Sequence, residues 1–193
     1  MKRYYITDRN LAGGVEPLLG IIRRRLAEGI DMIQIREKDM DGRALAELTG
    51  HVLGMENRLG TKILVNGRVD VALSTQADGV HLPADSISPA RIRTIAPVGF
   101  LIGVSCHELK EAERAEAEGA DFVVFSPVFP PVSKPTYGPA KGLEALQAVC
   151  RAVKIPVFAL GGISRDNAGG CLAAGATGVA GVSLFQDDTG ADP

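Results

Sequence analysis

Short aliphatic runs and longer amphipathic stretches alternate along the whole chain. Four segments resemble one another, because in each a glycine ends a helical pattern two or three residues before a new apolar run. These segments are 27–33, 77–80, 117–123 and 173–179. Further apolar runs lie between them, at 3–7, 62–66, 101–105 and 156–160. Together the two sets predict eight strands.

The stretches between the strands have aliphatic residues at three-to-four spacing, which predicts helices. The clearest are 17–28, 43–58, 108–118, 143–153 and 167–174. Regular alternation of strands and helices favours a parallel sheet with crossover helices, and eight units favour a closed (β/α)8 barrel, the TIM barrel of the α/β class. The alternative is an open doubly wound sheet, although no GxGxxG motif follows the first strand.

The chain length sharpens this picture. A single domain over 1–193 is short for such a barrel, which usually has about 250 residues. The last predicted strand is 178–182, and 183–193 is too short and polar for a full amphipathic helix. We therefore expect the eighth outer helix to be missing. Either a neighbouring subunit, as in a homodimer, or the 183–193 tail should then shield the first and eighth strands.

Composition excludes several classes of partner. Lys and Arg number 21 against 23 Asp and Glu, so the chain lacks the basic field that nucleic-acid binding needs. No apolar segment is long enough for a membrane span, and the N-terminus reads as a strand without a signal-peptide core. Three cysteines without CxxC spacing indicate free thiols in a reducing cytoplasm and predict no metal site.

Polar residues at the carboxyl ends of barrel strands are candidates for function. In the segment 32–38, Gln34, Arg36 and Lys38 share one face, because side chains alternate along a strand. We expect these three side chains to point into the barrel mouth. The alternative is that the two cations form ion pairs with Glu37 or Asp39 on a solvated rim.

The same alternation places Ser105 and His107 together after the fifth strand, where a histidine can transfer protons near neutral pH. Alternatively, His107 caps the following helix. His81 lies deeper in its strand and is interpreted as a hydrogen-bonded barrel residue. Cys106 has the opposite phase to His107, which predicts a packed thiol rather than a nucleophile.

Glycines follow the seventh strand at Gly161 and Gly162, and the eighth strand ends at Val182 and Ser183. Free N–H groups there predict a phosphate site, although glycines also serve simple tight turns. The loop 126–141 is rich in proline, and we expect it to cover the mouth and bring Ser133 and Lys134 to a ligand.

Several ordered motifs resemble the thiamine phosphate synthase/TenI family, from the N-terminus to about residue 185. They are Tyr5-Ile6-Thr7-Asp8, Gln34-Ile35-Arg36-Glu37-Lys38, Asn66 with Arg68-Val69-Asp70, Ala77-Asp78-Gly79-Val80-His81-Leu82, Gly103-Val104-Ser105, Ser126-Pro127-Val128-Phe129-Pro130 and Gly161-Gly162-Ile163. The resemblance implies the barrel fold and a small thiazole phosphate as ligand. It also adds Asn66 to the candidate substrate-binding residues.

The family contains two activities. Its synthases join a pyrimidine pyrophosphate to a thiazole phosphate and release pyrophosphate held by Mg²⁺, using aspartates at positions where this chain has Gly67 and Ser86. Mg²⁺ needs hard oxygen ligands, which Gly67 lacks and which Asp85 could supply only in part. The synthases also usually place a threonine at the position of Pro131.

The segments 66–70 and 81–89 resemble instead the TenI branch, the thiazole tautomerases, which aromatise a carboxylated dihydrothiazole phosphate by moving a proton. From sequence alone we therefore favour a tautomerase with His107 as the proton carrier and no metal or other cofactor. The alternative is a thiamine-phosphate synthase that uses Mg²⁺. The third interpretation is a thiazole phosphate binder or regulator without catalytic activity.

Overall fold

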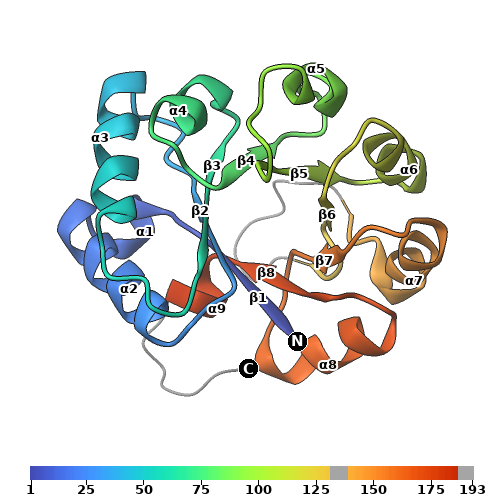
Figure 1. Ribbon diagram of the computed structural model, residues 1–193. Coiled ribbons are helices and arrows are strands. Elements are labelled where there is room, and N and C mark those ends of the chain that lie inside the picture. The colour runs from blue at the N-terminus through green and yellow to red at the C-terminus, as the bar shows by residue number, and fades with distance from the viewer. Residues whose placement is uncertain (131–138, 187–193) are drawn as a thin grey trace.

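The computed structural model describes residues 1–130 and 139–186 and shows a closed barrel of eight parallel strands inside a ring of helices (Figure 1). The strands are β1 (Lys2–Ile6), β2 (Met32–Ile35), β3 (Lys62–Asn66), β4 (Gly79–Leu82), β5 (Leu101–Cys106), β6 (Phe122–Phe125), β7 (Val157–Ala159) and β8 (Gly178–Gly181). Each strand pairs with the next one in the chain, and β8 pairs with β1. The predicted (β/α)8 barrel is confirmed, and the open sheet is excluded.

The five predicted helices are present, with shifted ends. They are α2 (Val15–Ala27), α3 (Gly42–Leu53), α6 (Leu109–Ala117), α7 (Gly142–Ala152) and α8 (Arg165–Ala173). Four short helices were missed: α1 (Arg9–Ala12), α4 (Val69–Ser74), α5 (Pro89–Arg93) and α9 (Ser183–Gln186). Within the described ranges, no helix has the length and apolar character to cross a membrane.

The largest error concerns the helix expected over 43–58, which ends at Leu53. Beyond it, the Asn57 side chain both donates to the Thr61 carbonyl and accepts the Thr61 N–H, at 2.8 and 2.9 Å. Asparagine commonly replaces helical hydrogen bonds by such local contacts. The polar segment after Leu53 is therefore a closed loop.

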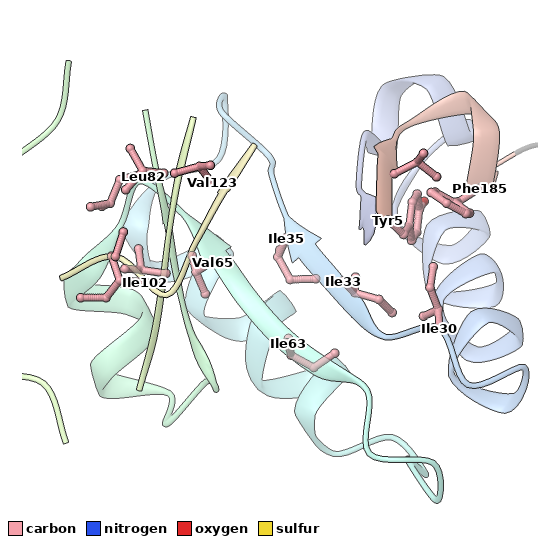
Figure 2. Close-up of a cluster of buried hydrophobic side chains, with 14 of the residues drawn as sticks. Tyr5, Ile30, Ile33, Ile35, Ile63, Val65, Leu82, Ile102, Val123 and Phe185 are labelled. Carbon is pink, nitrogen blue, oxygen red and sulfur yellow. The ribbon is translucent and has the colours of Figure 1, made fainter. Parts of the chain in front are cut away.

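Strand alternation divides the apolar side chains between two cores. One set, which includes Ile33, Ile35 and Val65, faces the helices (Figure 2). The other set fills the barrel interior and includes Tyr4, Phe122 and Phe158, whose rings meet edge to face at 5.5 to 5.8 Å. Such packing makes the interior a solid core rather than a channel.

Glycine makes room for these interior aromatic rings. A Cβ atom on Gly103 would lie 2.2 Å from the ring of Phe122. The chain has 23 glycines, and Gly103 serves the barrel interior rather than a connection between elements.

The repeated glycine segments carry a specific hydrogen bond at the amino-terminal end of the barrel. Asp31, Asp78 and Asp121 each accept a backbone N–H from the start of the strand that precedes their own in the chain, at 2.6 to 2.8 Å. The donors are the N–H groups of Arg3, Ile63 and Ile102. Since carboxylates strengthen such bonds, the repeat ties neighbouring strands together.

The end of the described chain covers one flank of β1, as Figure 2 shows for Tyr5 and Phe185. In place of a full eighth outer helix, the described residues after β8 form only the four-residue α9. The Tyr5 hydroxyl donates to Gln186 Oε1 at 3.1 Å, and Arg25 Nε donates to the Phe185 carbonyl at 2.7 Å. The first part of the 183–193 tail thus shields Tyr5, as expected. Residues 187–193 lie outside the described residues, and a neighbouring subunit stays a prediction.

Candidate active site

Strand β2 carries its polar residues to the carboxyl-terminal mouth of the barrel. Gln34 is only 1% exposed and lies inside the barrel, Arg36 is half-buried, and Lys38 is exposed. Ile33 and Ile35 pack under the helices, so the predicted alternation is present. Gln34 is deeper than expected, because its amide nitrogen donates to the Tyr4 hydroxyl at 2.9 Å.

The carboxylates of Glu37 and Asp39, which neighbour Arg36 and Lys38 in the sequence, both form ion pairs with Arg9. Its guanidinium bonds both Asp39 and the buried Glu37. The bond from Arg9 lowers the pKa of Asp39 from 3.8 to about 2. Within the described residues neither Arg36 nor Lys38 pairs with Glu37 or Asp39, so the ion pairs of the alternative interpretation are absent, although Lys38 is exposed. The positive charge of Arg36 and Lys38 is left for other anions.

Glu37 also fixes the turn that carries Arg36. Its carboxylate accepts the Thr7 hydroxyl at 2.6 Å and the Arg9 backbone N–H at 3.0 Å. The Thr7 oxygen in turn accepts the backbone N–H of Arg36 at 2.9 Å. Because Glu37 is 5% exposed and fully bonded, the ends of β1 and β2 form one rigid unit at the mouth.

His107 follows β5 at the mouth, half-buried, and the ring is held by one hydrogen bond. Its Nδ1 lies 2.8 Å from the carbonyl oxygen of Ser126, which can only accept. Nδ1 therefore carries the proton in the neutral ring, and Nε2 has no hydrogen-bond partner among the described residues. The cap of α6 is Glu108 and not His107, so the alternative of a capping histidine is wrong.

His81 lies below this level inside the barrel, as predicted. It is 3% exposed, and its ring nitrogens contact the Tyr4 hydroxyl at 3.3 Å and Ser105 Oγ at 2.8 Å. Burial, assisted by the charge of Arg36, lowers the pKa of His81 from 6.5 to about 3. His81 is therefore neutral near pH 7. Cys106 faces the helices and is fully buried, which confirms the packed thiol.

The glycine loop after β7 packs directly against the segment after β6. A Cβ on Gly161 would lie 2.7 Å from Pro127, and one on Gly162 would lie 2.4 Å from the Pro130 carbonyl oxygen. A side chain at either position would clash with the segment after β6, which is the structural role that the tight-turn alternative gives to both glycines. Within the described chain, neither Gly161 nor Gly162 donates its N–H to a backbone carbonyl of a turn or loop. Both readings of these glycines therefore stay open.

The remaining candidates occupy different parts of the mouth. Asn66 ends β3 beside His81 of β4, and Val182 and Ser183 connect β8 to α9. A phosphate at Val182 and Ser183 stays a prediction. Ser133 and Lys134 lie outside the described residues, as does half of the covering loop expected over 126–141.

A cavity of about 270 Å³ opens beside the mouth, between the β4–α5 loop and α6. Ser105 lies in its wall, together with Asp85, Ser86, Glu111 and Arg114. A second cavity, of about 390 Å³, lies at the amino-terminal end of the strands, where Lys2 and Asp31 line it. Catalytic sites of such barrels lie at the carboxyl ends, which favours the first cavity as part of the site.

The donor set for Mg²⁺ does not fit the pattern of two aspartates. Gly67 has a φ angle of 67° and offers no side-chain oxygen, while Asp85 and Ser86 are exposed. Across the described ranges, no three or more His, Cys, Asp or Glu side chains lie together so as to hold a metal ion.

Sequence reasoning missed three residues that organise this site. In the sequence Tyr4 resembles an ordinary strand residue, Thr7 belongs only to a family motif, and Glu37 was considered only as an ion-pair partner on the rim. Their alternation with buried apolar neighbours was visible, but their partners lie about 30 residues or more away in the chain. Only the closed barrel brings them together.

Comparisons with known proteins cover nearly the whole chain. Residues 3–185 match the family described as thiamine monophosphate synthase. The chain is 47% identical to a putative thiamine-phosphate synthase of Geobacter sulfurreducens, over 96% of this chain and 86% of that protein. It is 44% identical to the thiamine-phosphate synthase of Methanocella arvoryzae, over 96% and 88% of the two chains. A solved structure of thiamine phosphate pyrophosphorylase from Pyrococcus furiosus superposes with a TM-score of 0.85 at 36% identity, covering 97% of this chain and 88% of that one.

Proposed function

The chain belongs to the thiamine monophosphate synthase family, whose members serve thiamine biosynthesis, and we propose that it is itself a thiamine-phosphate synthase. In this reaction a thiazole phosphate is joined to a pyrimidine pyrophosphate, and pyrophosphate leaves. The observation that carries the proposal is the similarity, over almost the full chain, to relatives with this name. The synthase therefore becomes our main proposal, in place of the tautomerase that we favoured from sequence alone.

The mouth of the barrel has cationic and hydroxyl side chains that can stabilise pyrophosphate as a leaving group. When the bond to pyrophosphate breaks, negative charge develops on oxygen, and nearby fixed cations and N–H or O–H donors stabilise it. Arg36 and Lys38 lie at the mouth without a carboxylate partner in the described chain, and Ser105 stands across from them on β5. We assign pyrophosphate to these three residues and the thiazole phosphate to the backbone of Gly161, Gly162, Val182 and Ser183.

Release of pyrophosphate from the two substrates, with and without Mg²⁺, tests this function directly. We expect pyrophosphate and thiamine phosphate in equal amounts. Absence of both products at all Mg²⁺ concentrations would refute the synthase. Arg36→Ala should lower kcat/KM by about 10- to 100-fold, since it removes a charge-assisted bond to the leaving group.

Gly67 allows a sharper experiment, because the structure has room for the missing aspartate. A Cβ there would meet only Pro83 Cδ, at 3.9 Å, and Asp and Asn are the residues that best tolerate a φ angle of 67°. In a synthase, Gly67→Asp should raise the Mg²⁺-dependent rate, while Gly67→Asn, equal in shape but uncharged, should not. Equal rates for both variants would contradict a role for a carboxylate here.

The second candidate is the thiazole tautomerase, which the absence of side-chain oxygen at Gly67 and the exposed Ser86 favour. Such a reaction moves a proton and needs no metal. His107 is suited to it, because its Nδ1–H is held by the Ser126 carbonyl and its Nε2 is free to accept a proton. His107→Ala should then slow isomerisation of the dihydrothiazole by about 10² to 10⁴. An unchanged rate would exclude His107 as the proton carrier.

The third reading, a binder without catalytic activity, predicts binding of carboxythiazole phosphate and turnover of neither substrate set. Equilibrium binding measured beside the two activity assays separates all three readings. The cytoplasmic location and the homodimer stay predictions. Sedimentation of the purified protein tests the homodimer.

A further inference from the structure

Four polar side chains form a continuous line of hydrogen bonds through the barrel interior to the mouth. Gln34 Nε2 lies 2.9 Å from the Tyr4 oxygen, which lies 3.3 Å from His81 Nδ1. His81 Nε2 lies 2.8 Å from Ser105 Oγ. The first three residues are at most 3% exposed, whereas Ser105 is half-buried and lies in the wall of the 270 Å³ cavity.

The direction of each bond follows from the donor at the buried end. The amide nitrogen of Gln34 can only donate, so the Tyr4 oxygen accepts. The single phenol proton of Tyr4 then points to His81 Nδ1, its other partner among the described residues. An accepting Nδ1 is unprotonated, and the neutral ring must therefore carry its proton on Nε2, which donates to Ser105 Oγ.

The surroundings keep both titratable members in these states. Burial raises the pKa of Tyr4 above its usual value of 10.0, so the phenol retains its proton. Burial and the charge of Arg36 together keep His81 neutral near pH 7. The rest of the interior around them is apolar, with Phe122 in ring contact with both residues.

We propose that Tyr4 and His81 are positioning residues that set the direction of the Ser105 hydroxyl. Since His81 occupies the Ser105 oxygen with a donated proton, the proton of Ser105 is left to be donated to a ligand at the mouth. The atom of the substrate that meets Ser105 is then an acceptor, namely an anionic oxygen of a phosphate group. The identity of that group rests on the proposed function, whereas the proton direction does not.

The tautomer of His81 tests the direction in the protein without substrate. Nitrogen NMR of the imidazole rings distinguishes protonated from bare ring nitrogens, and loss of signals in His81→Asn assigns this residue. We expect the proton on Nε2 of His81 and on Nδ1 of His107, so the two histidines serve as opposite references. A proton on Nδ1 of His81 would reverse the two bonds that His81 makes, to Tyr4 and to Ser105, and would overturn the proposal.

A double-mutant cycle tests whether the line acts on substrate through Ser105. For the anionic substrate, Ser105→Ala should raise KM by about 10- to 100-fold, and Tyr4→Phe by about 3- to 10-fold. In the Ser105→Ala background, Tyr4→Phe should add less than about twofold. Independent, multiplying effects would overturn the coupling, because they would mean that Tyr4 acts by structure alone.

Tyr5→Phe is the matched control, since Tyr5 is equally buried and loses an equivalent hydroxyl but faces the helices. It should change KM by less than about twofold, as expected of a distant site that shares no partner with Ser105. An effect as large as that of Tyr4→Phe would contradict the proposal. If neither substrate pair is turned over, the proposed function fails, and the NMR measurement still decides the proton direction.

Discussion

Replacement of Glu37 tests how strongly the buried carboxylate holds the mouth together. Its side chain is 2% exposed and accepts three bonds, from the Thr7 hydroxyl, the Arg9 N–H and the Arg9 guanidinium, at 2.6, 3.0 and 3.3 Å. Loss of the carboxylate leaves the Thr7 hydroxyl and the Arg9 N–H without their acceptor, and each buried polar group left unsatisfied costs about 1 to 3 kcal/mol. We expect Glu37→Ala to lower the free energy of unfolding by about 2 to 5 kcal/mol and Glu37→Gln by about 1 to 3 kcal/mol.

Glu37→Gln costs less because it keeps the shape and one acceptor for Thr7. Its new amide N–H groups, however, face the donors of Arg9. Urea unfolding followed by circular dichroism gives the change, provided that the dependence on urea stays the same. Asp39→Asn is the control, since Asp39 binds the same Arg9 from the exposed side, where ion pairs contribute little.

Equal destabilisation of the protein by Asp39→Asn and Glu37→Gln would refute this expectation. That result would mean that burial of the Glu37 carboxylate contributes nothing beyond an exposed ion pair. A second readout follows from the bond between Thr7 and the Arg36 N–H. Glu37→Gln should also raise KM for the anionic substrate, because the turn that carries Arg36 loosens.

Three further outcomes follow from the barrel interior and the outer core. Gly103→Ala should destabilise the protein by about 1 to 3 kcal/mol in the same urea assay, because the added Cβ would overlap the ring of Phe122. Gly20→Ala, which places a Cβ in open space within α2, should stabilise the protein by about 0.5 to 1 kcal/mol. The pKa of His81 is lowered to about 3, so between about pH 3 and 6.5 the unfolded chain binds a proton that the native protein does not. Stability should therefore decrease as the solution is acidified through this window, and thermal melts at pH 7 and 5 should show a smaller decrease in His81→Asn. Burial raises the pKa of Cys106 to about 12 and that of Cys171 to about 11, so Ellman's reagent should titrate at most one thiol in the native protein and all three in guanidinium. Rapid reaction of all three thiols in the native protein would contradict their packing.

The barrel was predictable from sequence because its signal is local and repeated. Strands β2, β6 and β8 each follow a left-handed glycine at the end of a helix, and aspartates of the repeated segments bind the neighbouring strands. The short helices α4 and α5 were missed because six and five residues carry too little periodicity to read. Alternation likewise placed Gln34 and Arg36 on the inner face.

The site was less accessible to sequence reasoning than the fold. Alternation could not show that Arg9, from a neighbouring strand end, takes both Glu37 and Asp39. It could not show how deep Gln34 lies, because the height of a side chain in a barrel depends on the stagger of neighbouring strands. Contacts across the barrel form only when the sheet closes, and the pattern of neighbouring residues in the sequence does not indicate them.

The pairing of β1 with β8 and α9 has a consequence for the protein during its synthesis. Tyr5 meets Gln186, 181 positions further along the chain. At about 5 to 20 residues per second, a ribosome needs roughly 10 to 40 s to make this stretch. Throughout that time the outer edge of β1 has unpaired backbone groups that another nascent chain could bind. Emergence of β8 is therefore the event that ends the exposure of this edge, and chaperones would protect the chain most before it.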